Sequence, residues 1–465
     1  MATDIQVRNP TTRTTGWRRR AATTATAALL TCAFALPAQA QGKVAVVRDA
    51  EIETLLKDYA GPIFKAAGMK ASRVQIVLVN DPRFNAFVDG QRIFINTGTL
   101  SGSTVPNETI GVIAHETGHL AGGHQQRLRE QISAARTLAI VGGLLGAGAI
   151  AAGSIAGSSG GAQAGGALIT ATPELVQRNL LSYRRSEEMN ADQAAARFLN
   201  ATGQSMQGML TTFARFSQSL SLSGVQVDQY QVSHPLPRER IALLEELARK
   251  SKHFDAQDPQ QLVSRHQLMR AKIAAYTGGA QAVVRMFSKD RDSLAARYGD
   301  AIATDLAGNS AASLQKLDAL IKEQPGNPYF HEFRGEVLIK LRKTDEAIRA
   351  FTQAVKLDRS KSPLIRARLG FALVASGKPG NMSRAIDELR ASLQSEPDNF
   401  TAYRHLSQAY GQAGDIANAE LIMAEGNFRA GNAREAKVFA ARALQKLPKG
   451  SPGAIRANDI LTIGK

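Results

Sequence analysis

The chain has a single cysteine, Cys32, among its 465 residues. One thiol cannot form a disulfide within the chain, so a scaffold held together by disulfides is excluded. Cys32 also lies inside an N-terminal stretch, residues 1–40, that we expect to be cleaved off, and the mature chain would then contain no thiol. Such a chain suits an oxidising compartment.

Aromatic residues are also scarce, at 6%, and no basic run is interleaved with them, so nucleic-acid binding is not expected. The net charge is +17, and removal of residues 1–40 would leave 52 basic against 39 acidic residues, a charge of +13. A surface of this sign favours anionic partners such as lipid headgroups or acidic polypeptides. It could equally reflect a proteome that is basic throughout.

Residues 1–40 have the layout of a secretory signal. A cationic segment ends at Arg20, residues 21–40 carry no charge, and Ala38-Gln39-Ala40 has the small-x-small pattern of a cleavage site. We therefore expect export and cleavage before Gln41. A retained membrane anchor is the alternative, although the apolar part is short against the roughly 20 residues of a span.

The rest of the chain is organised around His115-Glu116-Thr117-Gly118-His119. Residues four apart share one face of a helix, so His115 and His119 could hold one Zn²⁺, with Glu116 placed to take a proton from bound water. We expect Asn107 to cap this helix and Glu108 to suit its positive end. A five-residue motif also occurs by chance, so the interpretation requires a third ligand.

A second expected helix, beginning near Tyr183, supplies that ligand. Glu188 and Asp192 are four residues apart and share a face. A carboxylate there would complete a His₂Glu zinc site with one position left for water. Asp192 is placed to accept a hydrogen bond from the far nitrogen of a zinc histidine. Glu187 is the rival ligand, and the spacing to Asp192 favours Glu188.

A small sheet is expected before the first histidine helix. Apolar residues at helical spacing predict a helix over 50–68, and strands are expected at 74–79, 85–88 and 92–96. Asp89-Gly90 between the last two strands is a strong hairpin signal. The edge of this sheet could bind a substrate as an added strand, or the sheet could be purely structural.

Residues 137–173 contain no charged residue and are rich in glycine and alanine. Residues 137–157 are long enough for a membrane span, which needs about 20 apolar residues. A single span would place the two histidines on one side of the membrane and the residues from Glu174 onward on the other. We therefore interpret residues 137–173 as a lid beside the site or as a loop that touches a membrane surface.

Four motifs in this order resemble one family of zinc metallopeptidases, the one that includes the CAAX prenyl protease and the heat-shock protease HtpX. They are Asn85-Ala86-Phe87, His115 to His119, Glu188 to Asp192, and Ser233-His234-Pro235. The soluble, exported branch with a helical-repeat tail is the most similar, and the motifs cover roughly residues 50–250. A metzincin is excluded, because its third histidine would fall at Gln125, and His124 is one residue early.

The resemblance implies a periplasmic endopeptidase with one Zn²⁺ per chain, held by His115, His119 and Glu188, and with Glu116 as general base. It further implies quality control and assembly of outer-membrane proteins, with chaperone-like activity beside the proteolysis. The partners would be unfolded or stalled outer-membrane proteins and their assembly machinery, with possible peripheral contact to a membrane. The alternative is a repeat-based chaperone or assembly scaffold whose peptidase is latent.

His234 and Arg240 follow from the same resemblance, which implies that both face the active site. His234 could stabilise the tetrahedral oxyanion. It could instead occupy the open zinc position and silence the enzyme. The resemblance implies that Arg240 supports the cleft.

The C-terminal half is helical, without strand signals, from about residue 257. Related segments begin near Pro328, Pro363 and Asn399, and spacings of about 35 residues are typical of tetratricopeptide repeats, which bind proteins in a curved groove. The predicted fold is mainly α: a signal peptide at 1–40, an α+β zincin-like domain with a small sheet at 41–255, and an all-α repeat domain at 256–465.

Overall fold

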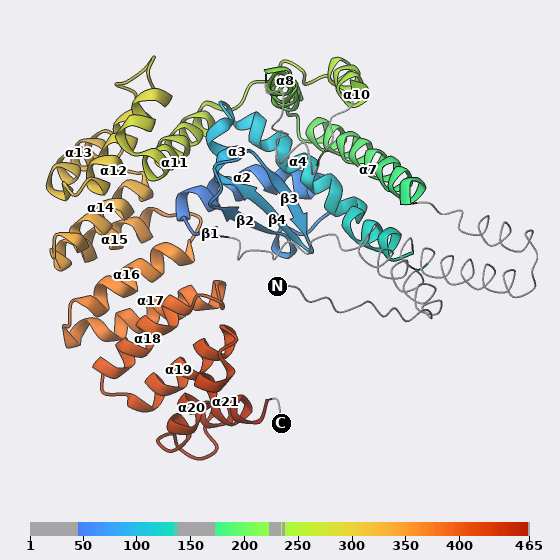
Figure 1. Cartoon of the computed structure of the whole chain (residues 1–465). Helices are drawn as coiled ribbons and strands as arrows, with labels where there is room; N and C mark the ends of the chain where they lie inside the picture. Colours follow the sequence, from blue (N-terminus) through green and yellow to red (C-terminus); the bar gives the residue numbers. More distant parts are fainter. Residues whose placement is uncertain (1–44, 135–136, 138–172, 223–233, 235–237, 464–465) are drawn as a thin grey trace, which may run out of the picture. The chain divides into compact units, whose positions relative to one another are not determined.

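A computed structural model describes residues 45–134, 137, 173–222, 234 and 238–463 (Figure 1). The expected signal peptide and almost all of the expected lid lie outside these residues. No helix in the described ranges is long and apolar enough to cross a membrane.

The sheet has four strands in the order β1-β2-β4-β3. Their bounds are β1 Val46–Val47, β2 Gln75–Val79, β3 Ala86–Asp89 and β4 Arg92–Asn96. The predicted hairpin is confirmed, because β3 and β4 pair antiparallel and Gly90 takes a φ of +62° at the turn. Glycine adopts that conformation without steric cost. The pairing leaves β3 at one edge of the sheet.

Two helices cover one face of this sheet (Figure 1). Helix α2 spans Ala50–Ala66, as expected from its apolar spacing, and helix α4 spans Pro106–Gly122. Leu55 and Ile113 from these helices pack with Ile93 and Ile95 of β4, and all four side chains are fully buried. Burial of each stabilises the fold by about 1.5–3 kcal/mol. The short helix α3, Thr97–Gly102, links the sheet to α4.

The expected cap at Asn107 is wrong. Helix α4 begins at Pro106, so Val105 is the N-cap residue and Asn107 lies inside the first turn. Proline suits that first position, because its missing N–H would be unpaired there anyway. The side chain of Asn107 instead donates to the Ser205 carbonyl and accepts from the Gly208 amide, which ties α4 to helix α8, Gln207–Leu222.

Three further elements complete the N-terminal part of the described chain. Helix α7 spans Pro173–Ala201 and contains the second motif, and helix α10 spans Arg238–Arg249. The helical stretch expected after α4 is present from residue 124 to residue 134.

The C-terminal half is helical throughout its described residues, as predicted. Its helices are α11 Gln260–Met286, α12 Leu294–Leu306, α13 Ser310–Glu323, α14 Pro328–Lys340, α15 Thr344–Leu357, α16 Pro363–Ala375, α17 Met382–Ser395, α18 Phe400–Gln412, α19 Ile416–Arg429, α20 Ala433–Leu444 and α21 Pro452–Thr462. A side chain on Gly335 would meet Phe351 at 2.7 Å, and one on Gly370 would meet Leu389 at 2.5 Å. These glycines therefore allow paired helices to approach closely.

Helix α11 belongs to two hydrophobic cores. Its Met269 and Ile273 pack in the core that the sheet, α2 and α4 share, whereas its Leu268 and Ala271 pack with the helices that follow α11. A buried histidine, His266, adds polar contacts. Its Nε2–H donates to the Ser103 carbonyl at 2.9 Å, and its Nδ1 accepts from the Tyr59 hydroxyl at 3.0 Å. The neutral ring, with its proton on Nε2, makes both hydrogen bonds.

We predict that His266 makes the fold sensitive to acid. Burial, the main cause, lowers the pKa of His266 to about 4. The unfolded chain binds a proton near pH 6.5, but the folded chain does so only near pH 4, so stability falls as the pH falls between these values. This loss is about 2 kcal/mol at pH 5. The thermal unfolding temperature of wild type should therefore fall more steeply from pH 7 to pH 5 than the unfolding temperature of His266→Gln.

The control is His253→Gln, at a partly exposed histidine, which should retain the wild-type slope. Equal slopes for wild type and His266→Gln would contradict the assignment.

Candidate metal centre

The two motif helices approach each other at a glycine. A Cβ on Gly118 of α4 would lie 2.8 Å from the carbonyl oxygen of Ala191 on α7, closer than any ordinary contact. The missing side chain therefore sets the distance between the helices. Because Gly118 stands between His115 and His119, and Ala191 follows Glu188 by three residues, this contact brings the carboxylate to the imidazoles.

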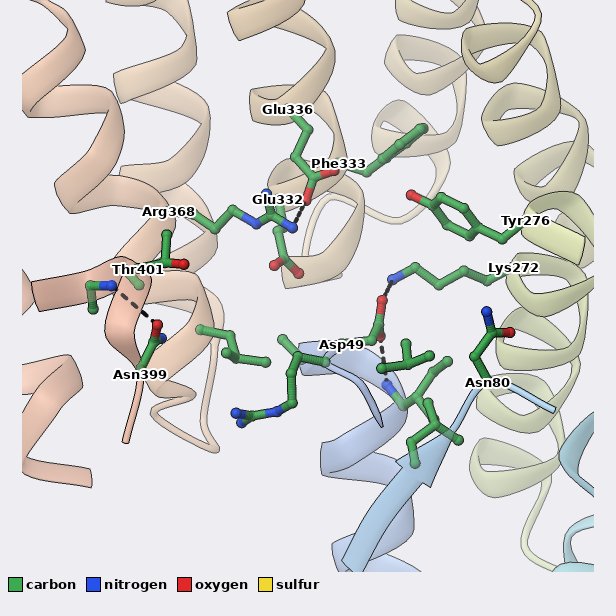
Figure 2. A pocket seen from close by; sticks show the side chains of 18 of the residues that line it. Asp49, Asn80, Lys272, Tyr276, Glu332, Phe333, Glu336, Arg368, Asn399 and Thr401 are labelled. Atoms are coloured by element: carbon green, nitrogen blue, oxygen red, sulfur yellow. Dashed lines mark hydrogen bonds and ion pairs between the residues drawn. The ribbon is translucent and has the colours of Figure 1, made fainter. Parts of the chain in front are cut away.

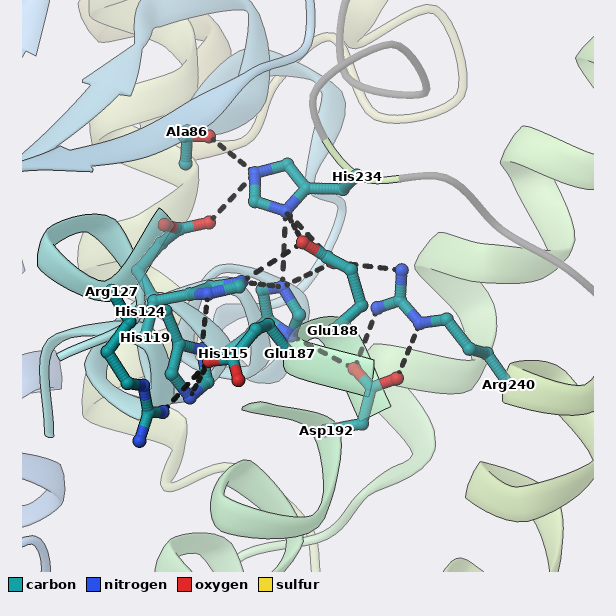
Figure 3. A network of polar contacts seen from close by, with 11 residues as sticks. Ala86, His115, His119, His124, Arg127, Glu187, Glu188, Asp192, His234 and Arg240 are labelled. Carbon is teal, nitrogen blue, oxygen red and sulfur yellow. Dashed lines mark hydrogen bonds and ion pairs between the residues drawn. The ribbon is translucent and has the colours of Figure 1, made fainter. Parts of the chain in front are cut away.

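Four buried side chains converge there, those of His115, His119, Glu188 and His234, and each offers one atom that could coordinate a metal ion (Figure 3). We call these atoms the metal donors. The Nε2 atoms of His115 and His119 are 3.0 Å apart, and each lies 3.3–3.4 Å from a Glu188 oxygen. The Nδ1 of His234 lies 3.4 Å from His115 Nε2 and 3.1 Å from Glu188. Zinc ligands 2.0–2.1 Å from an ion in a tetrahedron would be about 3.3 Å apart. The donor set therefore fits a zinc ion.

The carboxylate of Glu116 lies beside these donors and is fully buried. Neither of its oxygens accepts a hydrogen bond from the described residues, and its ion pair with His234 Nε2 is long, at 3.5 Å. Buried carboxylates are normally hydrogen-bonded, and one that accepts no hydrogen bond requires an explanation. A general base placed to take a proton from a water molecule would explain it.

Asp192 and Arg240 form hydrogen bonds and ion pairs with His115 and Glu188 of this cluster. His115 Nδ1 donates to Asp192 Oδ1 at 2.9 Å, which leaves Nε2 free to face the other donors. The fully buried Arg240, on α10, donates to Asp192 at 2.7 Å and to Glu188 at 2.9 Å. Burial by itself would raise the pKa of Asp192, but its bonds to His115 and Arg240 outweigh burial and lower it. The carboxylate thus remains charged.

His234 joins the site to the sheet edge. Its Nε2 lies 3.2 Å from the Ala86 carbonyl of β3, the edge strand, so this nitrogen donates and Nδ1 is left facing the metal donors. Burial would lower the pKa of His234, but the charges of Glu188 and Glu116 outweigh burial and raise it. The structure therefore places all seven predicted site residues in one buried cluster.

Sequence reasoning missed Arg127, rejected His124 as the third histidine of a metzincin, and considered Glu187 only as a rival ligand. Glu187 is not among the four clustered donors. Its Oε2 lies 2.9 Å from His124 Nε2 and 2.9 Å from Arg127 Nη2 (Figure 3). The one signal in the sequence was the position of His124, five residues after His119 and directly behind two glycines.

Two histidines, one carboxylate and a buried glutamate without a hydrogen bond in the described residues, brought together by two helices beside a sheet edge, are typical of a metallopeptidase site. Residues 47–248 match peptidase family M48, and residues 301–362 match the tetratricopeptide repeat. The chain carries an M48 peptidase domain followed by tetratricopeptide repeats, and it is a metallopeptidase. The predicted family and the predicted fold class are confirmed.

The chain is similar to the beta-barrel assembly-enhancing protease of Escherichia coli (strain K12), with 22% identity over 421 residues, 89% of this chain and 83% of that protein. The protein of the same name from Yersinia pestis is 24% identical over 330 residues, 70% of this chain and 65% of that protein. Among solved structures, MamA MSR-1 C2 matches with 20% identity and a TM-score of 0.31, covering 38% of this chain and 99% of that one.

We predict that Gly118→Ala weakens both the fold and metal binding. A methyl group at Gly118 would force α4 and α7 apart, and overpacking of this kind costs about 1–3 kcal/mol. Denaturant unfolding should measure that loss, and zinc retained after dialysis should fall with it. Gly411→Ala is the matched control, because that helical glycine has open space where a Cβ would stand. Unchanged zinc retention in Gly118→Ala would contradict the role given to this contact.

Proposed function

We propose that the chain is a zinc-dependent endopeptidase of the periplasm that acts in quality control and assembly of outer-membrane proteins. The observation that carries the proposal is the buried Glu116, which accepts no hydrogen bond from the described residues and lies beside four converging side chains that could hold a metal ion. The names of the relatives support the biological setting, and the signal expected at residues 1–40 supports export.

His115, His119 and Glu188 would hold the Zn²⁺, which polarises the scissile carbonyl and acidifies a bound water when present. Glu116 would take the proton from that water and pass it to the leaving amine. Asp192 and Arg240 would keep the His115 ring and the Glu188 carboxylate in place. The substrate would lie extended along the edge strand β3, whose Ala86 carbonyl already points at the site.

The repeats would receive the protein partner. A cavity of about 870 Å³ opens between β1, the start of α2 and helices α11, α14, α16 and α18 (Figure 2). Apolar and aromatic side chains such as Phe333 and Phe371 line it together with charged ones such as Lys272, Glu336 and Arg368. A groove with both kinds of side chain suits a polypeptide segment, which presents apolar side chains and a polar backbone.

A latent peptidase attached to a repeat-based chaperone is the second candidate, and His234 favours it. With Nε2–H bonded to Ala86, the Nδ1 of His234 stands among the other donors, where a water or a substrate oxygen would have to bind. We infer that His234 blocks the site at rest and that a partner on the repeats shifts the population towards an open state.

We predict that Glu188→Gln and Glu116→Gln have different effects on zinc content. Glu188→Gln should lose most of the zinc, because it removes a charged ligand. Glu116→Gln should retain the zinc but lose casein cleavage by a factor of about 10² or more, because the general base is gone. Metal analysis and peptidase assays on the purified proteins measure both. Full zinc content in Glu188→Gln would refute the ligand assignment, and a cellular role that survives Glu116→Gln would favour the scaffold alternative.

We predict that His234→Ala cleaves casein faster than wild type at equal zinc content, because the blocking ring is removed. His253→Ala, which changes a histidine outside the cluster, should not change the rate. A slower His234→Ala enzyme would instead assign the ring to oxyanion stabilisation. An unchanged rate would exclude both roles.

A further inference from the structure

At the end of helix α4 the chain turns so that the His124 side chain contacts His119. Gly123 takes a φ of +64° and ends the helix, and the next helical stretch begins at His124. The His124 ring then lies against Gly122, where a Cβ would be 2.1 Å from Nε2, so only glycine leaves room for it. His124 is buried, with an exposed fraction of 6%. The Gly-Gly-His turn thus holds one side chain in one place.

The hydrogen bonds of this ring allow one arrangement of protons when a metal is bound. His119 faces the other donors through Nε2, so its Nδ1 carries the proton and donates to His124 Nδ1 at 2.9 Å. His124 must then carry its own proton on Nε2, which donates to Glu187 Oε2 at 2.9 Å. Arg127 holds the same oxygen at 2.9 Å. Each group thereby fixes the tautomer of the next.

We propose that His124 is a positioning residue for the metal ligand His119, and that Glu187 anchors it. This proposal rests on the metal site proposed above. His124 would hold the His119 ring in the plane and tautomer that aim Nε2 at the ion. The conventional partner in this position is a carboxylate or a backbone carbonyl, as Asp192 is for His115.

One helix, α7, supplies both the proposed metal ligand Glu188 and the residue that holds His124. Glu187 and Glu188 are neighbours on α7, so the same turn supplies a ligand to the metal and the anchor for His119. The chain of contacts ends at Arg127, whose side chain is 49% exposed. The adjacent carboxylates therefore have different roles, one directed at the ion and one directed at the support of a histidine ligand.

Zinc affinity of the full-length protein tests the proposal, measured by competition with a chelator. His124→Ala and Glu187→Ala should each bind zinc about 10–100-fold more weakly than wild type, as expected when the hydrogen-bond partner of a ligand is lost. Glu187→Gln should restore most of the affinity, because its amide oxygen can still accept from His124. Gln126→Ala, at an exposed neighbour on the same helix, is the control and should bind like wild type.

A second readout separates positioning from a purely structural role. With Co²⁺ in place of zinc, the ring N–H protons of bound histidines give strongly shifted NMR signals. Wild type should show slowly exchanging signals from His115 and His119. In His124→Ala the His119 signal should disappear or exchange rapidly, while the His115 signal remains. Thermal unfolding of the metal-free proteins shows whether any variant is simply less folded.

The outcomes are distinguishable. If wild type itself binds no zinc, the metal site fails and this proposal fails with it. If wild type binds zinc but His124→Ala and Glu187→Ala retain its affinity and both N–H signals, only the positioning role is overturned. If His124→Ala does not fold, Glu187→Ala against Glu187→Gln decides the question.

Discussion

The close approach of α4 and α7 at Gly118 and Ala191 is the contact on which the site depends. A helix presents side chains at fixed angular spacing, but it cannot bring a ligand to a second helix. Removal of one Cβ allows the two backbones to meet at a distance that any other residue would prevent. Glu188 therefore reaches the imidazoles, and Glu187 beside it reaches His124.

The cluster contains more buried carboxylates than permanent cations, so it favours binding of a further positive charge. Glu116, Glu188 and Asp192 are buried together, and Arg240 is the one permanent cation that contacts Glu188 and Asp192 in the described residues. Burial alone would lower the pKa of His115, but its bonds to Asp192 and Glu188 raise it to about 10. Without a metal, a proton supplies part of the missing charge. Metal binding would release that proton.

Helix α11 explains why the repeats are not a loosely attached tail. One face contributes to the peptidase core and the other to the repeat core. The buried Lys272 on this helix pairs with Asp49 and Glu51 at the start of α2, next to the cavity shown in Figure 2. An isolated buried charge would be costly, so these pairs hold the two parts in register. A partner in the cavity would contact both parts at once.

The sequence alone determined the elements whose cause is local. Apolar spacing predicted helix 50–68, Asp89-Gly90 predicted the hairpin, and residue spacing placed His115 with His119 and Glu188 with Asp192. Tertiary packing decided the rest, because spacing along one helix does not say what faces it across a gap. Hence Asn107 lies inside a helix as a bridge to α8, and the turn at Gly123 makes His124 a neighbour of His119. Only the approach of two helices could assign Glu187 and Glu188 to different neighbours.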